Sequence, residues 1–117
     1  MAEFEAGQIV IADWPDAIPR EPNKLRPAVV IDDSGLFDTI YPAVILVPLA
    51  EQADFVIPSL AVYIEPSSEN GCLKPCWAVS HFVTATSKAR VTATPSRVTA
   101  EQLARIRSQI GVAIGLG

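Results

Sequence analysis

Short apolar runs alternate with turn signals along most of this chain. Runs rich in Val, Ile, Thr and aromatic residues, bounded by Gly, Pro, Asn or Asp, are typical of strands. They predict strands at residues 7–13, 28–32, 41–49, 61–65, 75–84 and 89–94. The run at 41–49 is apolar at nearly every position, which indicates burial on both faces of that strand. Five or six short strands of this kind predict a mainly β fold, a small curled barrel.

The end of the chain changes from strand to helix periodicity. Thr99 and Gln102 have the spacing of a capping box, and Val98 and Leu103 are placed as a hydrophobic staple. Apolar residues then recur every three or four positions, at Leu103, Ile106, Ile110 and Ile114. We expect a C-terminal α-helix of about three to four turns that packs one apolar stripe on the barrel or on a partner.

Length and composition indicate a single domain over residues 1–117. Half of the residues are hydrophobic and 19% are charged, which suits a globular chain with some apolar surface for self-association. The longest apolar run, 41–50, is half the roughly 20 residues that cross a bilayer, and the acidic N-terminus does not resemble a signal peptide. We therefore expect a cytoplasmic protein without a membrane segment.

Charge is unevenly distributed along the sequence. The net charge is −4, but residues 1–70 hold 3 basic and 12 acidic side chains, whereas residues 71–117 hold 6 basic side chains and one acid. The second part could therefore present a basic surface to a nucleic acid. Alternatively, the two parts interleave in the fold and their charges cancel.

Two cysteines, Cys72 and Cys76, and one histidine, His81, are the candidate soft metal ligands. Structural zinc normally takes four ligands, so the sequence predicts neither a metal site nor a cofactor. The cysteines are better interpreted as buried free thiols in a reducing compartment.

The segment KLRPAVVIDD, residues 24–33, places cationic side chains directly before a β-branched run. Arg26 precedes Pro27, which favours extended geometry at Arg26 and fixes where its side chain leaves the rim of the sheet. A guanidinium group is planar, always charged and suited to phosphate. The alternative is that Arg26 caps a strand or pairs with Asp32 or Asp33.

The order of motifs resembles the MazF/PemK toxins of bacterial toxin–antitoxin pairs. The motifs are GQIVIADWP, a Pro-rich loop, KLRPAVVIDD, VILVPLAEQ, ENGCLKPCWAVSHFVTATSKARV and TAEQLARIRSQIGVAIG. The resemblance implies an SH3-like barrel with a C-terminal helix, and a homodimer. It also implies a metal-independent endoribonuclease (mRNA interferase) that cleaves single-stranded RNA, and an acidic antitoxin whose disordered tail covers the active groove.

The same resemblance assigns roles to individual residues. The arginine of the family's arginine–proline pair maps onto Arg26, which would stabilise charge on the reacting phosphate. Arg20 and Lys24, on the preceding loop, would hold flanking phosphates. The family usually has a threonine or serine at the end of its third strand, where this chain has Ala50, and His81 could take over proton transfer. The other interpretation of His81 is a half-buried, hydrogen-bonded side chain.

Further candidate contacts lie beyond the barrel rim. Thr84, Thr86 and Ser87, expected in a loop after the fifth strand, would touch RNA or else be merely solvated. Trp14 and Trp77 could stack on bases, or could belong to the core or to a dimer interface.

The sequence also leaves a second function open. Toxins with the same barrel can act on DNA gyrase through the C-terminal helix, and a homologue without catalysis could simply bind an antitoxin. The loop cations Arg20, Lys24 and Arg26 favour the nuclease, because a helix-based gyrase poison does not require them.

Overall fold

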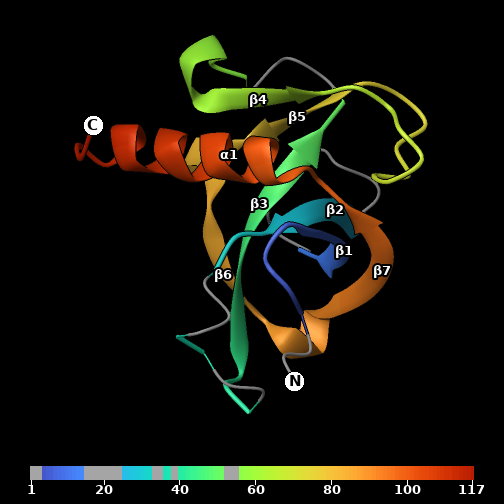
Figure 1. The fold of residues 1–117 in the computed structure, drawn as a ribbon. Coiled ribbons are helices and arrows are strands. Elements are labelled where there is room, and N and C mark those ends of the chain that lie inside the picture. Colours follow the sequence, from blue (N-terminus) through green and yellow to red (C-terminus); the bar gives the residue numbers. More distant parts are fainter. Residues whose placement is uncertain (1–3, 15–24, 33–35, 38–39, 52–55) are drawn as a thin grey trace.

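A single β-sheet and one α-helix make up the computed structural model, which describes residues 4–14, 25–32, 36–37, 40–51 and 56–117 (Figure 1). The strands are β1 (Gln8–Asp13), β2 (Leu25–Val30), β3 (Ala43–Ala50), β4 (Ala61–Ile64), β5 (Cys76–Val79), β6 (Thr84–Ser87) and β7 (Val91–Arg97). Three 3₁₀ turns, η2 (Pro58–Leu60), η3 (Ser80–Phe82) and η4 (Lys88–Arg90), connect some of them, and α1 spans Ala100–Ala113.

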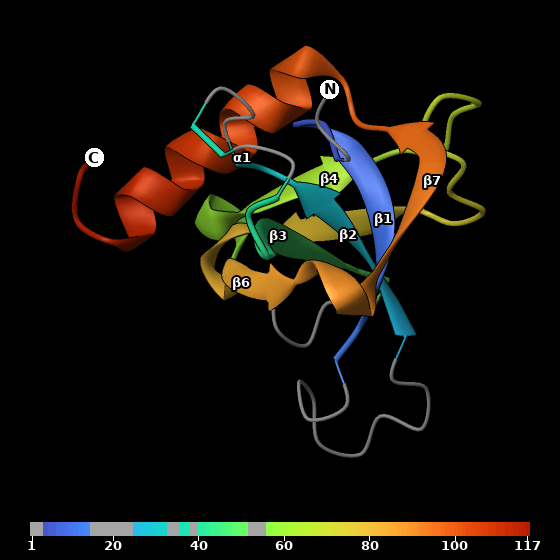
Figure 2. The same cartoon turned by 90° about the horizontal axis from the view of Figure 1, so that it is seen from below.

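The sheet is antiparallel, and its strand order is β4-β5-β3-β2-β1-β7, with β6 also paired to β3. Figure 2 shows β1, β2 and β3 side by side, with β7 curving along β1. The expected mainly β fold with a C-terminal helix is confirmed. Among the residues that the structure describes, the end strands β4 and β7 do not pair, so the sheet is curled but not closed. Strands from the acidic and basic parts of the sequence are interleaved within it.

The strand expected at residues 75–84 is interrupted, so that prediction was wrong in detail. Leu49 pairs with Ala78 in β5, and Leu46 pairs with Thr84 in β6. The two pairs are therefore three residues apart along β3 but six residues apart along the chain that forms β5 and β6. The three additional residues form the turn η3, which bulges out of the sheet. His81 lies in this turn rather than on a strand face with Trp77, while Thr84 and Ser87 lie in β6 rather than in a loop.

Two other strand limits differ from expectation. β7 continues through Pro95, which was expected to end it. Proline is tolerated there because β7 is an edge strand whose register with β1 shifts between Gln8 and Val10. β2 begins at Leu25 and not at Ala28, so Arg26 belongs to the strand itself and lies opposite Ala12 of β1.

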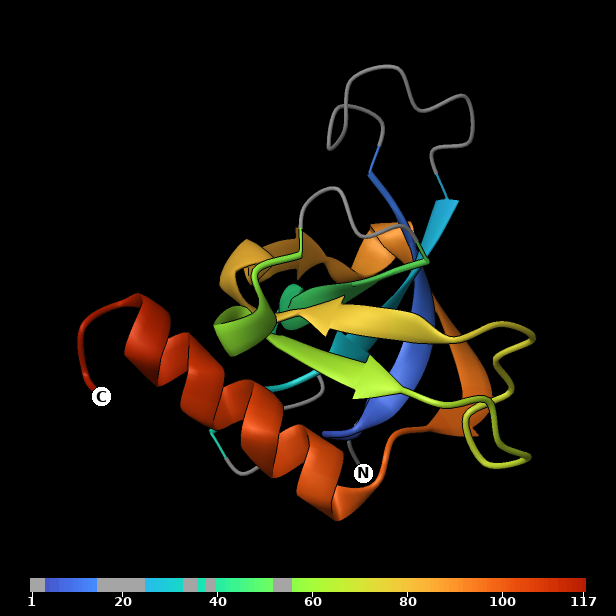
Figure 3. The ribbon, with the colours of Figure 1, turned by 90° about the horizontal axis from the view of Figure 1, so that it is seen from above.

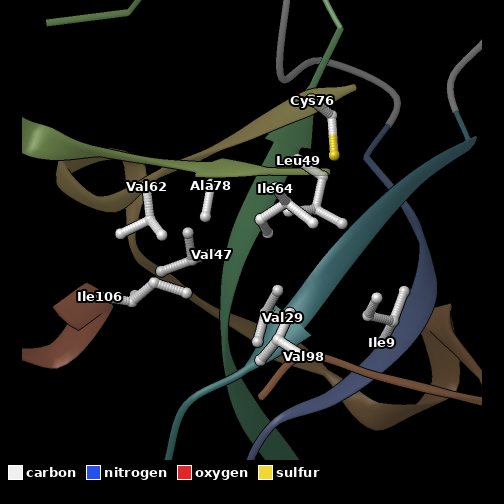
Figure 4. Packing of buried hydrophobic residues seen from close by; sticks show 10 residues of the cluster. All are labelled: Ile9, Val29, Val47, Leu49, Val62, Ile64, Cys76, Ala78, Val98 and Ile106. Atoms are coloured by element: carbon white, nitrogen blue, oxygen red, sulfur yellow. The ribbon is translucent and has the colours of Figure 1, made fainter. Parts of the chain in front are cut away.

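The central strands are buried on both faces because they separate two apolar cores. The first core gathers Ile9, Val29, Val47, Leu49, Val62, Ile64, Cys76, Ala78, Val98 and Ile106 (Figure 4). The second core lies on the opposite side of β1, β2 and β3 and gathers Phe4, Val10, Ala12, Ala28, Val30, Val44 and Leu46. Successive side chains of a strand point to opposite faces, so neighbouring residues enter different cores.

Helix α1 covers the first core. Its Thr99–Gln102 capping box is formed as expected, and Ile106 is fully buried and points toward Val47 in Figure 4. The C-terminal end of the helix extends past the strands (Figure 3), which agrees with the 66% exposure of Ile114. The predicted stripe therefore contacts the sheet through its first three members, Leu103, Ile106 and Ile110, but not through its last.

Polar contacts fix the position of α1 on the sheet. Gln109 accepts a hydrogen bond from the Ser80 hydroxyl at 2.7 Å and donates one to the Ala61 carbonyl at 2.9 Å. Arg107 donates to the carbonyls of Ile31 and Asp32, just after β2. These bonds satisfy a buried hydroxyl and backbone groups at strand ends, which would otherwise destabilise the fold.

The burial of Ile106 predicts its contribution to stability. We expect Ile106→Ala to lower the free energy of unfolding by about 2 to 5 kcal/mol, because it leaves a cavity between α1 and the sheet. Leu73→Ala is the control, because Leu73 is 96% exposed, and its effect should stay within about 0.5 kcal/mol. Urea denaturation followed by circular dichroism measures both values, and equal losses would contradict the proposed docking of the helix.

Candidate functional site

The alternation of β2 determines where Arg26 points. Ala28 and Val30 enter the second core, and Arg26, two residues before Ala28, projects to the same face. Thr84 and Thr86 of β6 lie opposite Leu46 and Val44, two further members of that core. Arg26 and these threonines therefore meet at one end of the second core.

A cavity of about 430 Å³ opens at this end, and we call it the arginine cavity. It is lined by Trp14, Arg26, Pro48, residues 82–87 and Arg90. Three of the expected site residues, Arg26, Thr84 and Ser87, thus lie on one cavity although they are about 60 positions apart in the sequence.

The electrostatics of the arginine cavity favour an anion. Two guanidinium groups line it, and none of its described lining residues carries a carboxylate. Guanidinium stays protonated at physiological pH, so the positive charge is permanent. Pro48, Phe82 and Val83 add apolar walls, which exclude water and strengthen the attraction for a negatively charged group.

The polar groups of the cavity differ in their availability. The Trp14 indole N–H donates to the buried Thr86 hydroxyl at 3.0 Å, which fixes the ring against β6. The Ser87 hydroxyl accepts from the Ala89 N–H at 3.3 Å and caps η4. Thr84 is exposed, and among the described residues the partner of its hydroxyl is the Ala85 carbonyl, at a distance of 3.4 Å. Thr84 is therefore the hydroxyl best placed to donate to a ligand.

Other expected site residues have different positions. Arg20 and Lys24 lie outside the described residues. His81 does not line the arginine cavity, although it directly precedes Phe82, which does. Its ring packs edge-on against Phe82, with centroids 4.7 Å apart, and its buried Nδ1 has no hydrogen-bond partner among the described residues.

Arg90 is the cavity residue that sequence reasoning missed. It lies at the end of η4, immediately before β7. The run Lys88-Ala89-Arg90 closely follows Thr84 and Ser87, which were expected to contact RNA, so its charge was a usable signal. Its convergence with Arg26 could not be read from the sequence because it depends on the turn at η4.

A second cavity, of about 580 Å³, lies at the mouth of the first core, and we call it the thiol cavity. Its lining consists of Ile9, Ile11, residues 25–27, 49–51 and 70–74, Cys76, Thr94 and Ser96. Both Arg26 and Ala50 belong to this lining. The lining also holds the Glu51 carboxylate, which lies 4.0 Å from the Lys74 ammonium, so it carries charges of both signs. The mixed charge makes this cavity less suited to a polyanion than the arginine cavity.

The Asn70-Gly71 turn shapes the wall of the thiol cavity. The buried Asn70 side chain accepts from the N–H groups of Ser67 and Cys72 and donates to the Glu65 carbonyl. Gly71 has a φ of +65°, and a Cβ there would come within 2.6 Å of the Ser96 hydroxyl. Only glycine fits this position without strain, which explains the turn signal.

The two cysteines are free thiols with sulfurs 3.9 Å apart. Cys76 is buried and Cys72 is half-buried. Burial, followed by the effect of neighbouring Cys72, raises the pKa of Cys76 to about 12. Among the described residues, no group of three or more His, Cys, Asp or Glu side chains could hold a metal ion.

The curled antiparallel sheet, its terminal helix and the cavity lined by two arginines define a small, mainly β protein. The sequence matches the family described as PemK-like, MazF-like toxin of type II toxin–antitoxin systems over residues 5–114, so the chain belongs to that family. Within the described residues, no helix is long and apolar enough to cross a membrane.

Solved structures show the same fold. MazF of Deinococcus radiodurans (Form-I) is 18% identical, with a TM-score of 0.73 and 96% coverage of each chain. The MazE-MazF complex of that organism (Form-II) is 16% identical, with a TM-score of 0.71 and 97% coverage of each. An endoribonuclease with its cognate antitoxin from a mycobacterial species is 14% identical, with a TM-score of 0.68, covering 100% of this chain and 98% of that one. No curated protein matches the sequence.

The thiol environment gives a prediction about reactivity. We expect iodoacetamide to alkylate Cys72 before Cys76, because only the thiolate reacts and burial keeps Cys76 protonated. In the Cys72→Ser variant, the rate at Cys76 should rise roughly tenfold per pH unit between about pH 7 and 9. Peptide mass spectrometry measures both rates.

The same shift affects stability in a defined direction. The pKa of Cys76 is higher in the folded state than in the unfolded state, where it is about 8.5. Its contribution to the free energy of unfolding is therefore fully present below pH 8.5 and declines as the pH rises toward 12.

In the alkylation experiment, equal reaction of both thiols near pH 7 would show that Cys76 is not enclosed as described.

Proposed function

We propose that this toxin is a metal-independent endoribonuclease that cleaves single-stranded RNA. The observation that carries the proposal is the arginine cavity, where two guanidinium groups and an exposed threonine hydroxyl converge without a lining carboxylate. A phosphodiester is the anion that this combination suits. The mycobacterial structure described as an endoribonuclease supports the same class of activity for the fold.

Arg26 would act on the phosphate itself. When the 2′-hydroxyl of RNA attacks the adjacent phosphorus, negative charge develops on the phosphorane oxygens, and a fixed guanidinium stabilises it. Cleavage then releases a 5′-hydroxyl and leaves a 2′,3′-cyclic phosphate. Arg90, Thr84 and Ser87 would hold flanking phosphates, and Arg20 and Lys24 keep the same proposed role.

The proposed partners follow from the same surface. An acidic antitoxin would cover the cavity and exclude RNA. Solved complexes of this fold with an antitoxin support such a partner. A homodimer is proposed as well, since the exposed Val112, Ile114 and Leu116 at the end of α1 offer apolar surface for self-association.

Replacing Arg26 tests the proposal. Wild-type protein with EDTA should cut a long unstructured RNA into discrete fragments ending in cyclic phosphate. Arg26→Ala should reduce the cleavage rate at least about 10²-fold, because the charge that stabilises the phosphorane is lost. Arg26→Lys should be intermediate, since it keeps charge but not the planar fork. Gel electrophoresis and end-group analysis measure the rates.

The control for this experiment is Arg105→Ala, which removes an exposed arginine of α1 that does not line the arginine cavity and should leave cleavage unchanged. If wild-type protein leaves every RNA intact and instead inhibits gyrase supercoiling, the toxin acts by protein binding and the nuclease proposal is wrong.

Proton transfer by His81 is a separate proposal with its own test. Loss of a general acid or base lowers rates by about 10²- to 10⁴-fold, so His81→Gln should show a loss of this size. Because His81 contacts Phe82, Phe82→Leu measures how much of the loss comes from altered packing. A wild-type cleavage rate in His81→Gln would reject the role and leave Arg26 unaffected.

A further inference from the structure

An aromatic pair on the outer face of β4 and β5 is not used by the proposed cleavage site. Tyr63 and Trp77 lie directly opposite each other in the register of these strands. Their ring centroids are 5.5 Å apart with an interplanar angle of 61°. Trp77 is half-buried and Tyr63 is 43% exposed, so both rings can be reached from solvent. Their neighbours along the strands, Cys76, Val62 and Ile64, point the other way into the first core.

Strand pairing and a shared cavity connect this pair to Arg26. Trp77 pairs with Ala50 of β3 on one side and with Tyr63 of β4 on the other. The pairing of β2 with β3 ends at Ala28 and Pro48, and beyond this point Arg26 and Ala50 line the thiol cavity together. Ala50 therefore connects the two features: it shares a cavity with Arg26 and pairs with Trp77, which in turn pairs with Tyr63, and we call these four residues the row. Figure 3 shows β4 and β5 side by side at this edge of the sheet.

The spacing of this row suits a nucleotide. Ala50 and Trp77 belong to paired strands, whose backbones lie about 4.8 Å apart, and Ala50 and Arg26 both line the thiol cavity. A nucleotide can span such a row from its phosphate to its base. Ala50 lies between Arg26 and Trp77 and contributes only a methyl group. In the MazF/PemK family this position usually carries a hydroxyl group, so alanine leaves more space here.

The row also has a direction. A guanidinium stands at one end, and at the other the Tyr63 hydroxyl donates to the Glu65 carboxylate at 3.0 Å. The carboxylate repels phosphate, whereas a nucleobase is uncharged and can lie beside it. This charge order places the phosphate at Arg26 and the base at the aromatic pair.

We propose that Trp77 and Tyr63 form a stacking platform for a nucleobase of single-stranded RNA, next to the phosphate bound by Arg26. The proposal rests on RNA being the ligand, and it adds a base-binding subsite to the cleavage site. Stacking on an aromatic side chain tolerates every base, so the platform holds the strand in place more than it reads its sequence.

Binding of an uncleavable RNA tests the platform separately from cleavage. The probe is a labelled pool of short random-sequence 2′-O-methyl RNA, in which the attacking hydroxyl is blocked. Trp77→Leu should weaken binding by about 5- to 150-fold, the range that corresponds to about 1 to 3 kcal/mol per stacked base. Trp77→Phe keeps a ring and should stay near wild-type affinity. Fluorescence anisotropy measures the affinities.

Tryptophan emission provides a second measurement. The chain has only two tryptophans, so the difference between wild-type and Trp77→Phe emission isolates Trp77. RNA should quench this difference signal. The matched control is Tyr41→Leu, because Tyr41 is 47% exposed and packs on Phe37 at 5.1 Å but lies before the start of β3, away from Ala50 at its end. It should leave RNA affinity unchanged.

The outcomes separate the two proposals. If wild-type protein cleaves RNA and Trp77→Leu binds the probe as tightly as wild type, the platform is wrong and the nuclease stands. If RNA quenches Trp77 but is never cut, the platform stands and the nuclease is wrong. If Trp77→Leu leaves RNA affinity intact but weakens self-association or antitoxin binding, the pair is a protein-docking surface and the platform is wrong.

Discussion

Burial of β1, β2 and β3 on both faces is the constraint on which the site depends. Each central strand sends alternate side chains into two different cores, so a polar side chain is tolerated only where one of the cores ends. Arg26 occupies such an end, two residues before the fully buried Ala28. Its charge can remain solvated there while its backbone is fixed by pairing with Ala12. The strand thus supplies a cation whose position is set by the packing of its neighbours.

That arrangement divides the proposed chemistry between different groups. Guanidinium stabilises developing charge but stays protonated, so it is a poor acceptor for the proton of a 2′-hydroxyl. Ala50 lines the thiol cavity together with Arg26, yet alanine can neither accept nor donate a proton. In the proposed scheme, proton transfer must therefore come from another group, and the candidate His81 does not itself line the arginine cavity, although it directly precedes Phe82, which does.

The sequence predicted the parts of this structure that are governed by local rules. The capping box at Thr99, the glycine turn at Gly71 and the positions of most strands follow from residue preferences over a few positions. The break at η3 could not be predicted, because it arises from the mismatch between β5 and β6 along the same edge of β3. Arg90 was missed for a related reason, since its approach to Arg26 depends on two turns and on the pairing of β7 with β1. Arg26 itself was identified because the arginine–proline pair is a local signal.

A surface that combines fixed cations with exposed aromatic rings could distinguish the two proposed ligands. Carboxylates of an acidic antitoxin and phosphates of RNA both satisfy a guanidinium, so Arg26 and Arg90 alone would bind either one. RNA also adds a planar base for each phosphate, which the proposed platform of Trp77 and Tyr63 would bind. Salt should weaken the shared electrostatic part of both complexes and affect stacking far less. An antitoxin would then have to compensate for the missing stacking with contacts of its own, and the thiol cavity, with its mixed charge, adjoins the same row because Ala50 and Arg26 line it.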